Sequence, residues 1–376
     1  ISYRELHSRV CKFSNVLKNN NIQKGDRVCI YLPMVPELAI AVLACARVGA
    51  IHSVVFAGFS SSALSARIND ASCKMVLTSD GSFRGNKTID LKSIVDEALK
   101  DCDCVDSVIV LNRINSGITL NKNEKWWNDE LDKVDDYFPA EIMDSEDPLF
   151  ILYTSGSTGK PKGMVHSSAG YMVYTAYSFK NVFNYNDEDV YWCTADIGWI
   201  TGHSYIVYGP LLNGATTLMF EGVPSFPDFG RFWEVCQKHK VNIFYTAPTA
   251  IRALQAFGTD LIDKYDLSFG LIMDATSNAA LFAFKDLGFI IGNGDMFKTN
   301  ATSNKIELTG GGWGGKYNVQ ALAVMGHNQG SMSANGNVMV CNINDVDPIP
   351  FLSKTRATSD VCANGVIYLQ NNVAIG

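Results

Sequence analysis

The segment 154–163 carries the residues best suited to chemistry. It reads Thr-Ser-Gly-Ser-Thr-Gly-Lys-Pro-Lys-Gly and directly follows the apolar run 148–153, which predicts a strand. Its glycines let backbone N–H groups turn towards an anion, its hydroxyls add hydrogen-bond donors, and its two lysines add positive charge. Such a loop suits the phosphates of a nucleotide. It is not a Walker A loop, because Pro161 follows Lys160 where that motif has Ser or Thr.

Strands and helices alternate along the first 268 residues, and they must position this loop. Short apolar runs predict strands at 28–32, 53–56, 74–78, 107–111, 148–153, 189–193, 216–220 and 242–246. Amphipathic stretches predict helices at 3–17, 37–48, 60–69, 166–179 and 229–239, and 112–146 reads as a polar loop around a helical Trp126-Trp127. The alternation predicts a parallel sheet with both faces covered. Ligands bind at the strand ends of such sheets, where the loop 154–163 stands.

The composition is that of a folded, mildly acidic protein. Of its 376 residues, 47% are hydrophobic and 18% are charged, and the net charge is -7. These values exclude a disordered chain and argue against a nucleic-acid binder, which needs clustered basic charge. The ten cysteines include no CxxC motif, so we interpret them as reduced thiols of an intracellular protein. No apolar run reaches the roughly 20 residues that span a bilayer, so we expect no membrane partner.

Five further segments narrow the interpretation. They read IYLPMVPE (30–37), VVFAGFS (54–60), YWCTADIGWITGH (191–203), FEGVP (220–224) and YTAPTAIR (245–252). Together with the loop 154–163, they resemble the acetyl-CoA synthetase family of the acyl-adenylate-forming enzymes. The resemblance runs from residue 1 to about 268.

The resemblance implies a fold of class α/β, with two parallel-sheet subdomains and a smaller β-rich subdomain. We expect 1–147 to form a subdomain with the CoA-side residues, and 148–320 to form one with the phosphate loop and the acyl pocket. The β-rich part would be 321–376 and truncated, with short strands at 338–341 and 365–369. These parts would make up the large N-terminal domain of such an enzyme. The C-terminal domain that carries the adenylation lysine is expected to lie outside this chain.

The resemblance also implies a two-step acetate–CoA ligase. ATP and acetate would give acetyl-adenylate and pyrophosphate, and coenzyme A would then give acetyl-CoA and AMP, with Mg²⁺ as the metal. The partners would be these small molecules and no nucleic acid, while the oligomeric state stays open. A propionyl-CoA synthetase and a non-catalytic nucleotide-binding module are the alternatives. We predict a cytoplasmic location, and the mitochondrial matrix stays open because the chain begins at Ile1.

Residues for ATP follow from the resemblance position by position. The expected ATP-binding residues are Thr154, Ser155, Gly156, Ser157, Thr158, Gly159, Lys160, Thr302 and Asp360. Among these, Thr158 and Lys160 are expected to act in catalysis together with Glu307, which also helps to hold Mg²⁺. Positive charge and hydrogen-bond donors are required there because the departing pyrophosphate accumulates negative charge.

Residues for the acyl group and for CoA follow in the same way. The expected acyl pocket consists of Trp199, Ile200, Thr201 and Thr276, and the Trp199 wall would exclude longer acids. The expected CoA-binding residues are Gly58, Arg84, Lys87 and Ala247. The two small residues would line the pantetheine path, and the two cations would contact the 3′-phosphate. The family more often has Arg at the position of Lys87, which keeps the charge but lacks the guanidinium fork.

The match weakens after residue 268. There the spacing to Glu307 is preserved, while most residues typical of the family are replaced. Genuine divergence, a fused or frame-shifted segment, and a sequence assigned without knowledge of the gene are three explanations. The preserved spacing favours the third.

Overall fold

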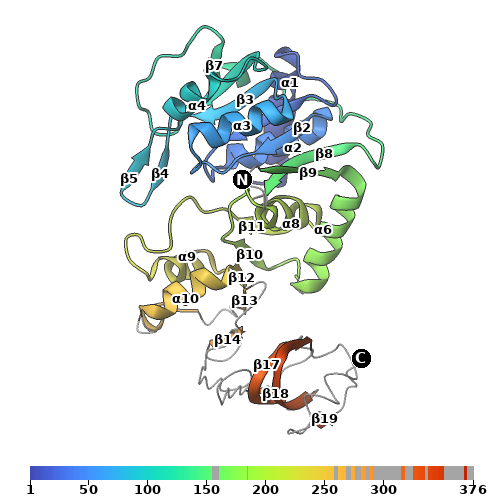
Figure 1. Cartoon of the computed structure of the whole chain (residues 1–376), viewed down its shortest axis with the longest axis vertical. Coiled ribbons are helices and arrows are strands. Elements are labelled where there is room, and N and C mark those ends of the chain that lie inside the picture. The colour runs from blue at the N-terminus through green and yellow to red at the C-terminus, as the bar shows by residue number, and fades with distance from the viewer. Residues whose placement is uncertain are drawn as a thin grey trace. The chain divides into compact units, whose positions relative to one another are not determined.

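The computed structural model describes residues 1–154, 161–183, 185–257 and 261–267, followed by separate strands between 272 and 370. The chain divides into two compact units. One consists of Ile1–Glu188 and Cys193–Pro227, and the other of Asp189–Trp192 and Asp228–Gly376. Figure 1 labels many of the helices and strands.

A seven-stranded sheet forms the centre of the first unit. Its strand order is β7-β6-β3-β1-β2-β8-β9, and every neighbouring pair is parallel except β8 and β9. The central strands read as continuous apolar runs, because both faces of a parallel sheet are covered. The sheet therefore confirms the predicted α/β class. The strands are β1 (Arg27–Tyr31), β2 (Ile51–Val54), β3 (Met75–Ser79), β6 (Ser107–Leu111), β7 (Glu124–Trp126), β8 (Pro148–Thr154) and β9 (Lys162–Ser167).

Helices pack on both faces of this sheet (Figure 1). Several begin at a side chain that accepts a hydrogen bond from the first turn, as Ser2 does from the Glu5 N–H group and Ser60 from that of Ala63. The second helix starts with Pro36 and ends at Gly49, whose φ of 78° is left-handed. The helices are α1 (Tyr3–Asn19), α2 (Pro36–Val48), α3 (Ser61–Ala71), α4 (Leu91–Leu99), α5 (Trp127–Leu131) and α6 (Ser168–Val182).

The core of the first unit has an aliphatic and an aromatic part. On one face of the sheet, α3 and α4 bury Leu64, Ile68 and Val95 against the strands. Elsewhere, Trp127 stacks on Phe13 of α1 with 3.8 Å between the ring centroids, and both side chains are buried. The expected polar loop 112–146 therefore contains a core residue.

The first unit continues past residue 147, where the sequence suggests a boundary. Strand β8 pairs with β2 in parallel, so its residues complete the first sheet. Tyr3 also donates a hydrogen bond from its hydroxyl group to the Ala215 carbonyl oxygen, 2.9 Å away. The later part of the unit holds α7 (Ile200–Gly202), a π-helical turn (His203–Tyr208), α8 (Gly209–Leu212) and β11 (Thr216–Leu218).

The second unit contains a parallel strand pair and a helix that packs beside it. Strand β12 (Ile243–Thr246) pairs in parallel with β13 (Ile272–Ala275). Trp192 of β10 (Val190–Cys193) contacts Phe232 of α9 (Arg231–His239) and Phe244 of β12, with 5.1 Å between ring centroids in each pair. The helix α10 (Pro248–Ala256) and the 3₁₀ turn Ile262–Lys264 follow.

The last described segments are all strands. They are β14 (Leu281–Phe284), β15 (Gly288–Ile290), β16 (Gly315–Tyr317), β17 (Met325–Ala334), β18 (Val338–Pro350) and β19 (Tyr368–Gln370). The first two form an antiparallel pair, and the other four form a sheet in the order β16-β17-β18-β19. The predicted strand 338–341 lies within β18, and 365–369 overlaps β19. The predicted β-rich subdomain at 321–376 stays a prediction.

Candidate functional site

Much of the expected nucleotide site lies outside the described residues. This is so for 155–160, which include Ser155, Gly156, Ser157, Thr158, Gly159 and Lys160. It is also so for Thr276, Thr302, Glu307 and Asp360. The assignments at these positions stay predictions. Thr154 and the residues on either side of the loop are described, and they show how its two ends are held.

The two ends of the predicted phosphate loop are paired with each other. Thr154 is the last residue of β8 and lies opposite Lys162, the first residue of the antiparallel strand β9. Tight packing supports this register, because a Cβ added at Gly163 would lie 3.1 Å from the Ile151 side chain and 3.2 Å from the Tyr153 ring. The sequence suggests a loop between a strand and a helix, whereas the structure places it between two paired strands. Its ends are thus fixed a strand spacing apart.

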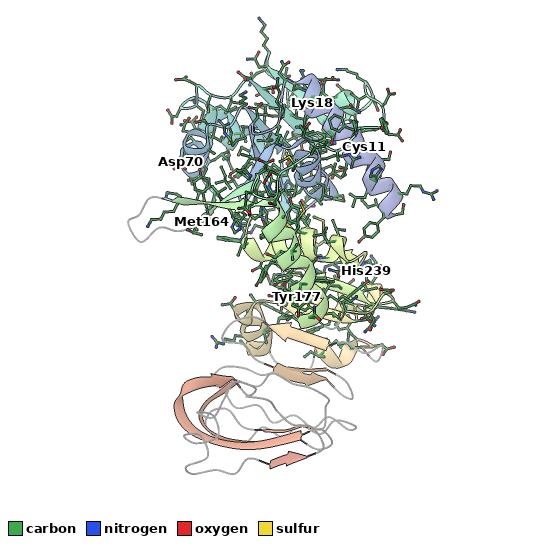
Figure 2. The ribbon with its side chains drawn as sticks, turned by 90° about the vertical axis from the view of Figure 1, so that its right-hand side faces the viewer. Cys11, Lys18, Asp70, Met164, Tyr177 and His239 are labelled. Carbon is green, nitrogen blue, oxygen red and sulfur yellow. The ribbon has the colours of Figure 1, made fainter. Side chains whose placement is uncertain are left out.

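The strand end before the loop is also anchored laterally. The Tyr153 hydroxyl group donates a hydrogen bond to Asp70 Oδ2, 2.6 Å away. Asp70, which is labelled in Figure 2, lies near the end of α3. The Arg67 guanidinium group lies 5.6 Å from the centroid of the Tyr153 ring and 4.6 Å from that of Phe59. Burial and the Asp70 carboxylate raise the pKa of Tyr153 well above its usual value, so the hydroxyl group remains a donor.

The predicted acyl-pocket and CoA-path residues meet around one phenylalanine. The Phe56 ring centroid lies 6.0 Å from that of Trp199, and Phe59 meets the same indole edge-on at 6.2 Å. A Cβ added at Gly58 would fall 2.4 Å from the Phe56 ring, and one added at Gly198 would fall 2.9 Å from the Phe56 Cα atom. A larger residue at Gly198 would therefore collide with backbone, and one at Gly58 would displace the Phe56 ring. Trp199 and Gly58 therefore both lie beside Phe56, while their assignments to the acyl pocket and the CoA path stay predictions.

The other described residues predicted for these two sites are Ile200, Thr201 and Ala247. Ile200 is exposed and Thr201 is half-buried at the start of α7, directly after Trp199. Ala247 follows strand β12 and belongs to the second unit.

A turn centred on Asp196 presents Trp199. The Asp196 carboxylate accepts a hydrogen bond from the Gly198 N–H group at 2.7 Å, and its backbone oxygen accepts one from the Trp199 N–H group at 3.0 Å. Burial raises the pKa of Asp196 to about 6, although the bond from Gly198 opposes the shift. Sequence reasoning missed Asp196 as the support of the predicted wall residue Trp199, and its place in the segment 191–203 was the available signal.

Buried aromatic rings support the same turn from behind. His203 is fully buried, and its Nδ1–H group donates to the Trp199 carbonyl oxygen, 3.2 Å away. Its ring stacks on Phe150 of β8 at 4.6 Å and on His52 of β2 at 5.4 Å between centroids. Burial lowers the pKa of His203 to about 4, so the imidazole is neutral at physiological pH. This supports a structural role.

The two predicted phosphate-binding cations face each other on a hairpin. It consists of β4 (Ser82–Arg84) and β5 (Lys87–Ile89), with Arg84 directly opposite Lys87 and both side chains exposed. The turn between them contains Gly85 with a φ of +64°, a value that glycine tolerates best. Opposed residues of a hairpin project from the same face, so the two cations can contact one phosphate group together.

The cysteines, the helix lengths and the possible metal ligands can be compared with the expectations from composition in the described ranges. Eight cysteines there are free thiols, and seven of them are buried. The helices of this part are all too short or too polar to cross a membrane. Within the same ranges, no three His, Cys, Asp or Glu side chains are arranged to hold a metal ion.

Comparison with known proteins identifies the family. The family model described as AMP-binding enzyme matches residues 1–293. The chain belongs to the AMP-binding enzyme family. Among AMP-binding enzymes, the acetyl-coenzyme A synthetase of Desulfatibacillum aliphaticivorans is 58% identical over 261 residues, which are 69% of this chain and 40% of the relative. Acetyl-coenzyme A synthetase 2 of Pseudomonas aeruginosa is 60% identical over 259 residues, again 69% and 40%.

A third relative, the acetyl-coenzyme A synthetase of Nostoc linckia, is 55% identical over 265 residues, which are 70% of this chain and 79% of the relative. The chain spans about 40% of the length of the first two relatives. The predicted resemblance to acetyl-CoA synthetases among the AMP-binding enzymes is therefore confirmed. The matched lengths also agree with the predicted extent, 1–268.

Proposed function

We propose that this chain, a member of the AMP-binding enzyme family, is part of an AMP-forming acetate–CoA ligase. One structural observation supports this most: Trp199 and Gly58, assigned to the acyl pocket and to the CoA path, both pack against Phe56. An acyl-adenylate held beside the indole would then lie next to the route of the attacking thiol. The identity of 55–60% to proteins named acetyl-coenzyme A synthetase points the same way.

In the first proposed step, an acetate oxygen attacks the α-phosphorus of ATP. The bond to pyrophosphate breaks, and pyrophosphate leaves with the bonding electrons. Hydrogen-bond donors and lysines beside the leaving group stabilise this transition state, which is the role we propose for Thr158 and Lys160. Mg²⁺ would neutralise part of the same charge, with Glu307 as its proposed ligand. Acetate is already ionised at neutral pH, so this step requires no general base.

In the second proposed step, the thiol group of CoA attacks the acetyl carbon. The new C–S bond replaces the C–O bond to AMP, the thiol proton is released, and AMP leaves with the bonding electrons. We propose that Arg84 and Lys87 hold the 3′-phosphate, while Gly58 and Ala247 leave room for the pantetheine arm. The opposed, exposed cations of the hairpin support this assignment. The buried free thiols support the proposed cytoplasmic location.

Exchange of labelled pyrophosphate into ATP tests the first step, and CoA-dependent release of AMP tests the second. Both are measured on the full-length protein with acetate, propionate and butyrate. We expect exchange that requires acetate and a kcat/KM that is highest for acetate. If kcat/KM is instead highest for propionate, the preferred substrate is propionate and not acetate. ATP binding without acid-dependent exchange would favour the non-catalytic module.

A further inference from the structure

The hairpin that carries Arg84 and Lys87 is held by Glu221, a residue far away in the sequence. One oxygen of this carboxylate, Oε1, accepts a hydrogen bond from the Phe83 N–H group at 3.4 Å. The other, Oε2, accepts from Arg113 Nε at 3.0 Å and from a second nitrogen of the same guanidinium group. Glu221 is largely buried, with 12% of its side chain exposed. Charge-assisted bonds of this kind fix geometry well.

Arg113 extends the support to the side chain of Phe83. Its guanidinium group lies 5.0 Å from the centroid of the Phe83 ring. Phe83 is thus held at its backbone by Glu221 and at its ring by Arg113. Successive residues of a strand point to opposite faces, so holding Phe83 on one face directs Arg84 to the other. The register places Lys87 opposite Arg84.

Arg113 is itself fixed to the end of the central sheet. The buried carboxylate of Asp80, one residue after β3, accepts hydrogen bonds from the N–H groups of Arg113 (2.6 Å), Ile114 (2.9 Å) and Ser116 (2.9 Å). Burial alone would raise the pKa of Asp80, but these bonds lower it below its usual value. The position of Arg113 is therefore set by the fold before any ligand arrives.

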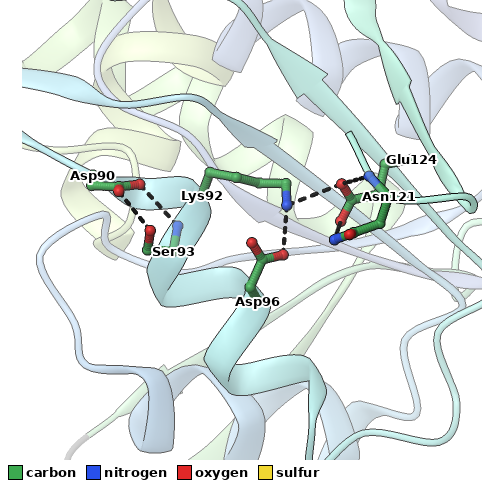
Figure 3. A network of polar contacts seen from close by, with 6 residues as sticks. All are labelled: Asp90, Lys92, Ser93, Asp96, Asn121 and Glu124. Carbon is green, nitrogen blue, oxygen red and sulfur yellow. Dashed lines mark hydrogen bonds and ion pairs between the residues drawn. The ribbon is translucent and has the colours of Figure 1, made fainter. Parts of the chain in front are cut away.

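The hairpin is also supported at its tip and after its second strand. A Cβ added at Gly85 would lie 3.7 Å from the side chains of Val223 and Phe226, in the segment that follows Glu221. After β5, the buried Lys92 of α4 forms ion pairs with Asp96 at 2.5 Å and with Glu124 of β7 at 3.0 Å (Figure 3). The α4 end is therefore tied to the sheet independently, and Glu221 controls the side nearer to Arg84.

We propose that Glu221, through Arg113 and Phe83, is a positioning residue for the CoA half-reaction. It holds the hairpin so that Arg84 and Lys87 meet the 3′-phosphate of CoA. Its carboxylate contacts the hairpin backbone and Arg113, so its effect is exerted through the hairpin. This inference rests on the proposed function and deepens it, because it assigns recognition of a phosphate monoester to one pre-oriented pair of cations.

The test is Glu221→Gln in the full-length protein. The amide keeps the size of the side chain but removes the charge that holds Arg113. We expect acetate-dependent pyrophosphate exchange to stay within about twofold of wild type, because that step uses no CoA. The KM for CoA should rise about tenfold with little change in kcat, because a misplaced binding group loses much of its contribution. With 3′-dephospho-CoA, which lacks the recognised group, wild type and variant should differ by less than about twofold.

Three further variants complete the design. Arg113→Lys keeps the positive charge but loses the two-pronged guanidinium group that bonds Glu221. It should therefore raise the KM for CoA by a smaller factor, about threefold. In the double variant Glu221→Gln/Arg84→Ala, the two effects should fall short of additivity, because Glu221 acts through Arg84. Glu97→Gln is the matched control, since Glu97 forms an exposed ion pair with Lys100 on α4. It should leave every parameter unchanged.

The results separate this inference from the function on which it rests. An unchanged KM for CoA in both single variants overturns the positioning role, as does an equal loss with CoA and 3′-dephospho-CoA. A parallel loss of exchange and of CoA use overturns it as well, because that pattern indicates general damage. If wild type itself lacks acetate-dependent pyrophosphate exchange, the proposed function is wrong. The inference about Glu221, which depends on that function, is then also wrong.

Discussion

The exposed fraction of the Trp199 side chain helps to decide between two interpretations: a wall of the acyl pocket or an ordinary core aromatic residue. It is 48% exposed, while the aromatic residues of the unit's core, such as Trp127, are almost completely buried. A tryptophan held by Phe56 and Phe59 but open on another side offers an apolar surface to a ligand. At the scale of the residue, this exposure favours the interpretation of Trp199 as a wall of the acyl pocket.

Shortening this side chain should therefore change the choice of acid. We expect Trp199→Ala to raise the ratio of kcat/KM for butyrate to that for acetate by at least about tenfold, because space for each added methylene is worth about 1–3 kcal/mol. Trp199→Phe keeps an aromatic wall and should change the ratio much less. Initial rates with the three acids measure both. An unchanged ratio in Trp199→Ala would place the acyl pocket elsewhere.

Buried histidines should make the stability of the first unit sensitive to acid. His203 keeps its neutral form in the folded protein down to a pKa of about 4, while its unfolded value is 6.5. Burial, assisted by His203, also lowers the pKa of His52. Because both pKa values are depressed, their contribution to stability is present above pH 6.5 and is lost as the pH falls towards 4. Each histidine adds a slope of up to about 1.4 kcal/mol per pH unit.

Urea unfolding at several pH values between 7.5 and 4.5 measures this slope. His203→Gln removes one titrating group and should flatten the dependence by up to about 1.4 kcal/mol per pH unit. His7→Gln is the control, because His7 is exposed on α1. An equal pH dependence in wild type and His203→Gln would show that His203 does not couple proton binding to folding.

At the scale of elements, the sequence predicted the helices and strands that have a clear hydrophobic pattern of their own. The runs that became β1, β3 and β6 are largely apolar, and each was placed to within about two residues. The hairpin β4–β5 and strand β9 were missed because tertiary contacts hold them. Strand β9 is largely exposed and is defined by its pairing with β8. Intrinsic strand preference is a weak guide in such cases.

Two glycines with left-handed backbone offer a matched test at the ends of elements. Gly49 ends α2 with a φ of 78°, and an added Cβ would lie 2.9 Å from the Met143 sulfur atom. Gly25 has a φ of 83° and nothing within 4 Å of an added Cβ. We expect Gly25→Ala to cost about 1–2 kcal/mol from the left-handed backbone alone. Gly49→Ala should cost about 1–3 kcal/mol more because of crowding.

The free energy of unfolding of the two variants, from denaturant titration, isolates the packing cost. If both variants lose the same free energy of unfolding, the loop around Met143 moves aside at no energetic cost.

At the scale of the whole molecule, the sequence could nominate only those candidate site residues that lie within one segment. Trp199, Ile200 and Thr201 follow one another, so a motif finds them together. Glu221 and Arg113 are 108 positions apart and meet only in the folded unit. Their pairing leaves no periodicity or spacing in the sequence. The contact of Trp199 with Phe56 was likewise beyond sequence reasoning, although both segments were singled out.

The proposed nucleotide site gives a prediction for the stability of the whole protein. A ligand that binds only the folded state stabilises it by about 2.7 kcal/mol at one hundred times its Kd. We therefore expect ATP to raise the melting temperature of wild type, and the double variant Thr158→Ala/Lys160→Ala to lose most of that shift. Lys238→Ala, at an exposed position on α9, is the control and should keep the full shift. If the double variant is stabilised by ATP as strongly as wild type, the loop between β8 and β9 does not bind the triphosphate.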